Sequence, residues 1–411
     1  MARLRFYNGK VLKNYKICEE DVYVDGGMIS APFDGPFDRE IDLQGNLLMP
    51  SFKNAHAHSA MTFLRSYDDN LPLSSWLSEI CWPNEAKLSD ESVYYFTALA
   101  VMEYLSSGIT ASFDMYTHND AYMRIMDETG FKGIICSGLN NYDNDVSNIE
   151  REFLKFPGKF RLGIHGEYTT GPERLKVCLD LKDKYREPCF THLAETKGEV
   201  EGCISRYGKT PAKFLYDEGF FEYGGGGFHC CYMTDEDIDI LASNGLYAVS
   251  CPASNLKLAS GIAPIEKMRK RGVKIALGTD GAASNNALDM FKEMYLVTAL
   301  QKYITGDASA CPADEVIKMA CANSALAMGL ENCDDLDMGK SADMIVIDLH
   351  RPNMQPVHNL VSNLVYAGSK ENVLMTVING NILYEDGSFS IGIDENEVYK
   401  KCDELRKEIF K

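Results

Sequence analysis

The middle of the chain alternates between strand-like and helical segments, and this alternation restricts the fold more than any other feature. Apolar runs such as GITASFDMY and KGIICSGL end in polar residues and are followed by segments with helical periodicity. Eight such units over about 290 residues predict an α/β fold, a (β/α)8 TIM-like barrel. The expected strands are the one ending at His58 and those near residues 109–116, 132–139, 160–167, 188–195, 224–232, 246–253 and 273–280.

A doubly wound open sheet is the alternative architecture for such an alternation. No GxGxxG motif follows the first strand, and the number of strands favours a closed barrel. We therefore expect catalytic residues, if there are any, at the carboxyl ends of the strands, because chemistry in barrels of this kind is found there.

The two ends of the chain differ from the middle. Short β-rich runs are separated by turn signals such as Asn8-Gly9 near the start and Asn379-Gly380 near the end. We expect residues 1–50 and 341–411 to meet as one small sheet domain, with a C-terminal helix in the second part. Residues 51–340 would then form the barrel.

Charge and composition restrict the partners. A net charge of −19 provides no basic field for nucleic acid or anionic lipid, so we expect a small-molecule substrate. No run approaches the ~18 apolar residues of a membrane span, and the first residues lack a signal-peptide core, which predicts a cytoplasmic protein. Thirteen scattered cysteines are typical of reduced core thiols. The sequence leaves the oligomeric state open, a homo-oligomer included.

Polar residues concentrate where the expected strands end. His56 and His58 are two residues apart on the first strand, so both imidazoles point to one face. Five of the eight histidines share this rim, whereas His118, His350 and His358 lie in loop-like contexts and are assigned no role. The residues at the rim are His56, His58, His165, Glu167, His192, Glu195, His229 and Asp280.

Three imidazoles and a carboxylate form a suitable ligand set for one divalent metal that keeps a position open for water. His56, His58, His192 and Asp280 fit this description. The same ligands suit Zn²⁺, Fe²⁺ and Mn²⁺, and a bound metal lowers the pKa of water from 15.7 to about 7. Glu195 follows a proposed ligand by three residues and is the candidate proton shuttle.

Each of these residues also has an ordinary structural interpretation. Asp280 could cap the next helix, His229 could be a packed core histidine, and Glu195 could be a first-turn glutamate. The segments HGE and PCFTH, at residues 165–167 and 188–192, also resemble the zinc signature of cytidine-type deaminases. Those signatures open helices, whereas both segments here close strands, which argues against that family.

Several longer motifs resemble the amidohydrolase superfamily, in particular its 5′-methylthioadenosine/S-adenosylhomocysteine deaminase branch. They are NAHAH, THLAET, GFHC, SCPASNLKLASGIAPI, LGTDGAASNN and LRSYDDNLPLSSWLSEICWPNEAKL, and the likeness runs from about residue 45 to about 385. The resemblance implies a barrel carrying a small β-sandwich made by both termini. It also implies one divalent metal, usually zinc, on His56, His58, His192 and Asp280.

The same resemblance implies roles for the remaining residues. Glu195 would protonate a ring nitrogen, Asp280 would deprotonate the water and His229 would orient it. Glu85 and His165 match positions that contact the ribose and base. The implied reaction is hydrolytic deamination of an adenine nucleoside or thioether derivative: S-adenosylhomocysteine, 5′-methylthioadenosine, adenosine or 5′-deoxyadenosine. The alternatives are deamination of guanine, a pterin or cytosine, and a barrel that keeps its metal without catalysis.

Four departures from the branch concern the substrate, one of which is Ser250-Cys251-Pro252 where HNP or HCP often stands. HGEYT replaces the usual HSPYT and is expected to place Glu167 near the ligand. Cys231 stands in the segment that often reads HCVH. An arginine expected after the third strand has no clear counterpart, since Asn148 stands there and Arg151 is the nearest candidate. Contacts of Glu167, Arg151 and Cys231 with the substrate are therefore left open.

Overall fold

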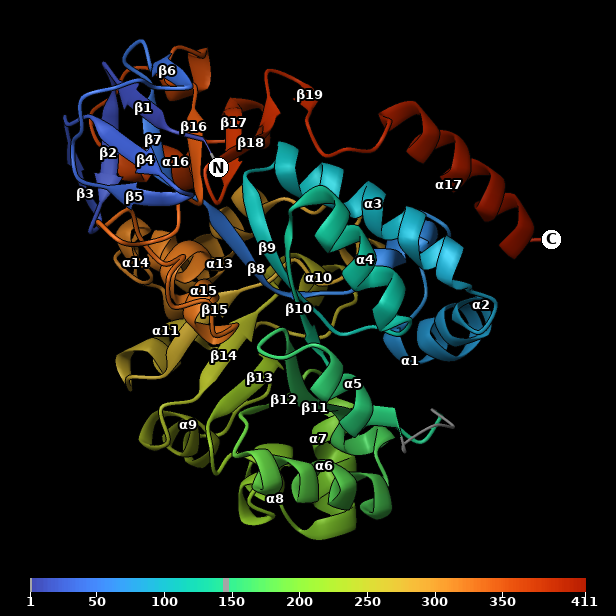
Figure 1. The fold of residues 1–411 in the computed structure, drawn as a ribbon. Coiled ribbons are helices and arrows are strands. Elements are labelled where there is room, and N and C mark those ends of the chain that lie inside the picture. Colours follow the sequence, from blue (N-terminus) through green and yellow to red (C-terminus); the bar gives the residue numbers. More distant parts are fainter. Residues whose placement is uncertain (1, 143–147) are drawn as a thin grey trace.

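A computed structural model describes residues 2–142 and 148–411, and its centre is a barrel of eight parallel strands (Figure 1). Each strand pairs in parallel with the next one in the chain, so the predicted (β/α)8 architecture is confirmed. The strands are β8 (Phe52–Ala57), β9 (Ile109–Asp114), β10 (Lys132–Cys136), β11 (Phe160–Gly166), β12 (Cys189–Leu193), β13 (Gly225–His229), β14 (Tyr247–Ser250) and β15 (Lys274–Leu277).

The seam between the last and the first strand is closed just beyond β15. The backbone N–H of Asp280 donates to the carbonyl of His56 over 3.0 Å, and the Asn54 amide exchanges two hydrogen bonds with Thr279. A Cβ atom on Gly278 would lie 2.8 Å from the Cβ of His56, so a glycine is needed for this close approach. The closure brings Asp280 beside the histidines of β8.

Helices surround the barrel (Figure 1). The longer ones are α3 (Asp90–Ser106), α4 (Asn119–Thr129), α6 (Pro172–Tyr185), α7 (Lys197–Tyr207), α9 (Asp235–Ser243) and α13 (Met290–Thr305). The shorter ones are α1 (Leu73–Ser75), α2 (Trp82–Glu85), α5 (Ile149–Lys155), α8 (Pro211–Asp217), α10 (Pro252–Lys257), α11 (Ile265–Lys270), α12 (Ala282–Asn285), α14 (Ala313–Lys318), α15 (Ser324–Ala327) and α16 (Leu360–Tyr366).

Strands from both ends of the chain form a small sandwich-like unit beside the barrel (Figure 1). One sheet has the order β5-β4-β1-β6, and the other has the order β19-β18-β17-β16-β7-β2-β3. The bounds are β1 (Leu4–Tyr7), β2 (Lys10–Lys13), β3 (Lys16–Cys18), β4 (Val22–Asp25), β5 (Met28–Ser30), β6 (Arg39–Asp42), β7 (Leu47–Pro50), β16 (Met344–Ile347), β17 (Val373–Ile378), β18 (Asn381–Glu385) and β19 (Ser388–Phe389). Phe6, Val24, Leu48 and Met344 belong to a buried cluster in this unit.

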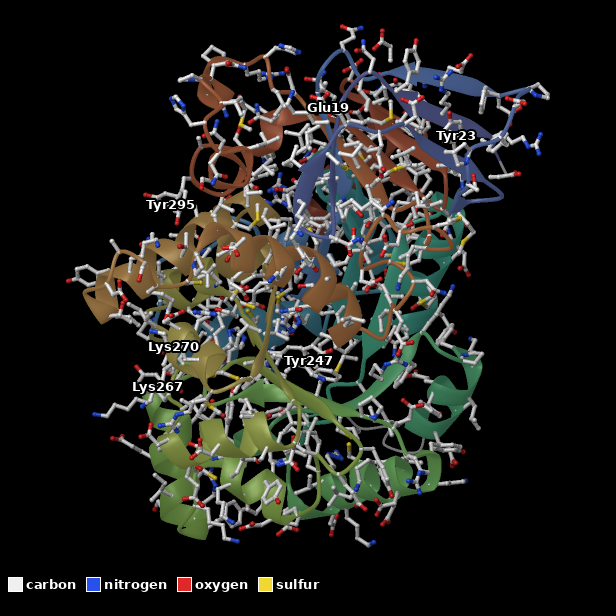
Figure 2. The ribbon with its side chains drawn as sticks, turned by 90° about the vertical axis from the view of Figure 1, so that its left-hand side faces the viewer. Glu19, Tyr23, Tyr247, Lys267, Lys270 and Tyr295 are labelled. Carbon is white, nitrogen blue, oxygen red and sulfur yellow. The ribbon has the colours of Figure 1, made fainter. Side chains whose placement is uncertain are left out.

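The side view separates the two parts of the molecule. Figure 2 shows Glu19 and Tyr23 in the sheet unit at one end, whereas Lys267 and Lys270 of α11 lie on the barrel. The C-terminal helix α17 (Glu395–Ile409) packs on barrel helix α3, where Lys401 pairs with Glu91 over 2.9 Å. The chain therefore returns to the barrel after its last strand.

A buried ion pair links the barrel to the sheet unit. Lys132 of β10 donates to Asp343 over 2.6 Å, and the Asp343 side chain is fully buried. The Asp343 carboxylate also accepts from the Ser341 hydroxyl and from the backbone N–H of Asn379. Loss of the lysine would leave a buried charge without its strongest partner.

We expect Lys132→Met to lower the free energy of unfolding by about 3–5 kcal/mol, because removing one partner of a buried pair leaves the other uncompensated. Lys159→Met is the matched control, since Lys159 pairs with Asp127 on the surface, and it should cost less than about 1 kcal/mol. Urea unfolding of both variants measures the difference. Equal, small losses would show that the buried pair does not stabilise this junction.

Two further properties concern the whole of the described chain. All thirteen cysteines are unpaired, and twelve of them are buried. None of the helices among the described residues combines the length and the apolar character needed to cross a membrane.

Candidate metal centre and active site

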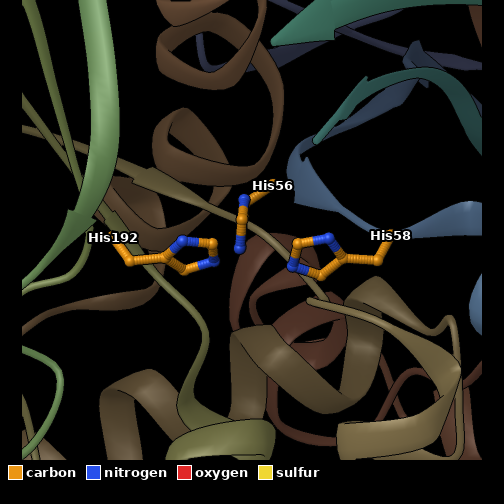
Figure 3. A group of neighbouring side chains, drawn as sticks. All are labelled: His56, His58 and His192. Atoms are coloured by element: carbon orange, nitrogen blue, oxygen red, sulfur yellow. The ribbon is translucent and has the colours of Figure 1, made fainter. Parts of the chain in front are cut away.

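Three histidines converge at the carboxyl end of the barrel (Figure 3). His56 and His58 come from the end of β8, and His192 comes from β12. The ring centroid of His56 lies 4.8 Å from that of His58 and 4.9 Å from that of His192. One nitrogen from each ring lies within 4.8 Å of the others. Such mutual distances suit imidazoles that share one metal ion.

Asp280 completes this cluster from the end of the eighth strand. Its Oδ1 lies 3.2 Å from Nε2 of His58 and 3.5 Å from Nε2 of His56. Its Oδ2 accepts hydrogen bonds from the hydroxyls of Ser254, over 2.6 Å, and Ser284, over 2.8 Å. One carboxylate oxygen is thus fixed by hydroxyls while the other faces the histidines.

The hydrogen bonds of the rings favour metal binding through Nε2. Nδ1 of His58 donates to the carbonyl of Met115 and Nδ1 of His192 donates to the carbonyl of His165, both over 2.6 Å. A ring that donates from Nδ1 keeps the lone pair of Nε2 for a metal. His56 is fully buried, and neither of its ring nitrogens has a hydrogen-bond partner among the described residues. Buried polar atoms are rarely left without partners, so these residues fit a divalent metal.

The charges in the cluster agree with this interpretation. Burial, followed by the neighbouring imidazoles, lowers the pKa of His56 and of His192 well below 6.5, which favours the neutral rings that a metal requires. Burial alone would lower the pKa of His58, but the Asp280 carboxylate raises it to about 9. Burial is likewise outweighed at Asp280, where His58 holds the pKa of the carboxyl well below its usual range. A metal cation on these ligands would likewise stabilise the carboxylate form of Asp280.

Glu195 lies beside this cluster, between β12 and α7. Burial raises the pKa of its carboxyl, and the Ser260 hydroxyl donates to its Oε1 over 3.3 Å. The Glu199 carboxylate accepts the backbone N–H groups of Ala194 and Glu195, each over 2.8 Å, and so fixes the turn. Glu195 precedes the helix N-cap Thr196, so it is not the first-turn glutamate that the sequence left as an alternative.

His229 ends β13 with a positive φ of 70°, a conformation that non-glycine residues adopt rarely and often at functional sites. Its Nδ1 donates to Oδ1 of Asn255 over 2.8 Å, so Nε2 takes no part in this hydrogen bond. Asp280 also has a positive φ, of 60°, and it is not the N-cap of α12, which is Gly281. Both side chains line the cavity described below.

One short segment orients three of these side chains. Ser254 holds Asp280, Asn255 holds His229 and Ser260 holds Glu195. In the sequence, SCPASNLKLASG is recognisable as a family motif, and none of its residues was assigned a role. Glu199 was missed as well, although Thr196 and Glu199 have the T-x-x-E spacing of a helix start, which could have drawn attention to it.

A cavity of about 730 Å³ opens onto the cluster. His58, His192 and Asp280 line its inner end together with Glu195 and His229. Glu85 of α2 and His165 of β11 line it too, as do the aromatic rings of Trp82 and Tyr142, whose centroids are 4.6 Å apart. Burial raises the pKa of Glu85. At His165, burial and the charges of His58 and His229 lower the pKa to about 4.

The structure corrects the expectation for Glu167. Its buried carboxylate forms a two-point ion pair with Arg206, over 2.6 and 3.1 Å, and does not line the cavity. Arg151 is exposed on α5 and Cys231 is buried, and neither lines the cavity, whereas Asn148 does. His118, which was assigned no role, lines the cavity and pairs with Asp90 over 2.6 Å.

Comparison with known proteins gives consistent matches. The model of the Amidohydrolase family matches residues 47–383. The 5-methylthioadenosine/S-adenosylhomocysteine deaminase of Pelotomaculum thermopropionicum is 38% identical over 370 residues, covering 88% of this chain and 85% of that protein. The protein of the same name from Syntrophomonas wolfei is 36% identical over 414 residues, covering 98% and 96%. The crystal structure of an adenosine deaminase from Xanthomonas campestris with bound zinc superposes with a TM-score of 0.92 at 28% identity, covering 100% of this chain and 99% of that one.

Proposed function

Because the chain belongs to the amidohydrolase family, we propose that it hydrolytically deaminates adenine nucleosides and their 5′-thioether derivatives, yielding the hypoxanthine product and ammonia. The observation that carries this proposal is the arrangement at the inner end of the cavity. Three imidazoles, a carboxylate held by two hydroxyls and a buried glutamate meet there. The names of the similar proteins support an adenine nucleoside as the substrate.

His56, His58, His192 and Asp280 would hold one divalent metal. A bound metal supplies a Lewis acid, which brings the pKa of a coordinated water close to 7. We propose zinc, since these nitrogen and oxygen donors suit it and the similar adenosine deaminase structure contains it. Metal analysis of the purified protein tests this: one equivalent of zinc is expected, and iron or manganese in its place would overturn the choice of metal.

The remaining residues would move protons and orient the substrate. Asp280 accepts a proton from the attacking water, and His229, fixed by Asn255, orients that water. Glu195 delivers a proton to a ring nitrogen of the base, so that the amino-bearing carbon accepts the nucleophile. The amino group of the tetrahedral carbon then takes the proton held by Asp280 and leaves as ammonia, while the hydroxyl proton returns to Glu195 as the carbonyl of the product forms. Glu85 and His165 would contact the ribose and the base from the cavity wall.

The direct test is ammonia release by zinc-loaded protein with a panel of compounds. The panel contains 5′-methylthioadenosine, S-adenosylhomocysteine, 5′-deoxyadenosine, adenosine, guanine and cytosine. Turnover confined to the adenine nucleosides is the expected result. Turnover of only guanine or cytosine would replace the proposed substrate class, and no turnover of any compound by the metal-loaded protein would contradict the deaminase proposal.

We expect Asn255→Ala to lower kcat about 10–100-fold, because the partners that orient histidines at metal sites have effects of this size. The variant removes only the acceptor for Nδ1 of His229, so the zinc content should be unchanged. Asn244→Ala is the control, since its amide bonds to the Ile240 carbonyl at the end of α9. Steady-state kinetics and metal analysis check both variants, and unchanged kcat in Asn255→Ala would refute the role given to His229.

A further inference from the structure

The charged groups of the cavity wall bear on which substituents the non-reacting part of the substrate can have. The described residues that line the cavity include the carboxyl groups of Glu85, Glu152, Glu195 and Asp280, but no lysine or arginine. Residues 143–147, outside the described part, read DNDVS in the sequence and contain neither cation. The histidines of the wall are the remaining candidates for positive charge, and three of them belong to the reacting end.

Several cations of the segments around the wall have other partners or lie outside the cavity. The Lys87 ammonium donates to Asn84 and to the carbonyl of Ile409, over 2.9 and 3.0 Å. The Lys257 ammonium donates to Asp69, over 2.6 Å, and to the carbonyl of Ala283, over 2.9 Å. Arg206 is held by Glu167, and Arg151 is exposed on α5. Each of these groups would have to leave its present surroundings to reach a ligand.

One part of the cavity wall is aromatic, apolar and acidic. It is bounded by Leu73, Trp76, Trp82 and Tyr142, and by Glu152, whose Oε2 accepts from the Asn119 amide over 2.8 Å. A volume of about 730 Å³ is within the range that encloses a drug-sized ligand, so a nucleoside leaves room for a substituent at C5′. That substituent would lie between rings and a carboxylate.

Resting on the proposed function, we propose that this cavity selects adenine nucleosides whose 5′ substituent carries no negative charge. A carboxylate placed against this wall would gain no lysine or arginine partner among the described lining residues, and it would face Glu152. An apolar thioether would instead pack on the rings, and an ammonium group would find a carboxylate. S-adenosylhomocysteine, whose tail ends in an amine and a carboxylate, would therefore be a poorer substrate than 5′-methylthioadenosine.

The test compares four compounds by kcat/KM and by calorimetric Kd. They are 5′-methylthioadenosine, S-adenosylhomocysteine, the carboxamide of S-adenosylhomocysteine, and S-adenosyl-3-thiopropylamine, which keeps the amine but lacks the carboxylate. We expect kcat/KM for S-adenosylhomocysteine to be at least about tenfold lower than for each of the other three compounds. A tenfold ratio corresponds to an unfavourable charge interaction of about 1.4 kcal/mol. An equally poor carboxamide would mean that size and not charge decides, and would overturn the proposal.

Two variants on α5 and at its start sharpen the test. Asn148→Arg places a cation in the wall. It should raise the ratio of kcat/KM for S-adenosylhomocysteine to kcat/KM for 5′-methylthioadenosine by about tenfold. Arg151→Ala, at an exposed position outside the cavity, should leave the ratio unchanged. A selective loss of S-adenosylhomocysteine turnover in Arg151→Ala would show that this arginine reaches the ligand and would overturn the proposal.

The two readouts separate this inference from the proposed function. If the compounds bind in the expected order but none releases ammonia, the proposed reaction fails and the selectivity stands. If all four turn over with similar kcat/KM, the proposed reaction stands and the selectivity fails. If none binds, both are refuted.

Discussion

The variant Glu195→Gln is expected to lower kcat for ammonia release by at least about a thousandfold, within the 10²–10⁴ range for removal of a general acid–base group. The amide keeps the shape of the carboxyl group and its hydrogen bond from Ser260, but it cannot exchange a proton with the base. Burial raises the pKa of Glu195, so the acid form that donates the proton persists to higher pH than in an exposed glutamate. Steady-state kinetics measure the loss of kcat, and metal analysis measures the zinc content.

The control for this variant is Glu201→Gln on the same part of the chain. Glu201 is exposed on α7 and pairs with Lys197 over 3.4 Å, so its replacement should leave kcat unchanged. Zinc content should stay near one equivalent in both variants. If Glu195→Gln retained activity within tenfold of the parent protein, another group would have to supply the proton and the proposed role of Glu195 would be wrong.

The variant His58→Asn is expected to lose most of the bound metal and to lower ammonia release by more than about 100-fold, because removal of a ligand exceeds the 10–100-fold effect of an outer-shell partner. The ring of His58 donates from Nδ1 to Met115, and its Nε2 is directed to the site shared with Asp280. The asparagine side chain is shorter and cannot reproduce this direction. Metal analysis after dialysis against a weak chelator, followed by zinc titration, measures the change.

The matched control is His358→Asn at an exposed position outside the barrel rim, which should keep both metal and activity. Circular dichroism must show that His58→Asn is folded, since a loss of fold would also release metal. A folded His58→Asn protein that retains one equivalent of tightly bound metal and full activity would remove His58 from the proposed ligand set.

The fold and most of the positions around the site could be predicted from the sequence because both depend on local patterns. Alternating strands and helices can be recognised from periodicity, and a residue at a strand end must lie at the rim once the barrel closes. This logic placed His56, His192 and Asp280 near one another from segments far apart in the chain. It failed for Glu167, which also ends a strand but turns to Arg206 of α7. The position at a strand end determines where the backbone lies. It does not determine which neighbouring group the side chain contacts.

The groups that orient the site could not be predicted in the same way. Ser254, Asn255 and Ser260 are small polar residues in one segment, and each holds a side chain from a different strand. Serine and asparagine occur equally in caps and turns, so their identity alone does not say which distant group they contact. Their roles became visible only when the loops that follow three strands were placed side by side.

The sequence by itself determined the barrel, the sheet unit made by both termini and the rim that carries the histidines, because periodicity and turn residues act over short distances. The tertiary structure decided which rim residues meet. Closure between the last and first strands puts the carboxylate of Asp280 beside His58, and the absence of a cation from the described cavity wall is a property of many segments together. Such relations depend on directions and distances between side chains, which a linear pattern does not contain.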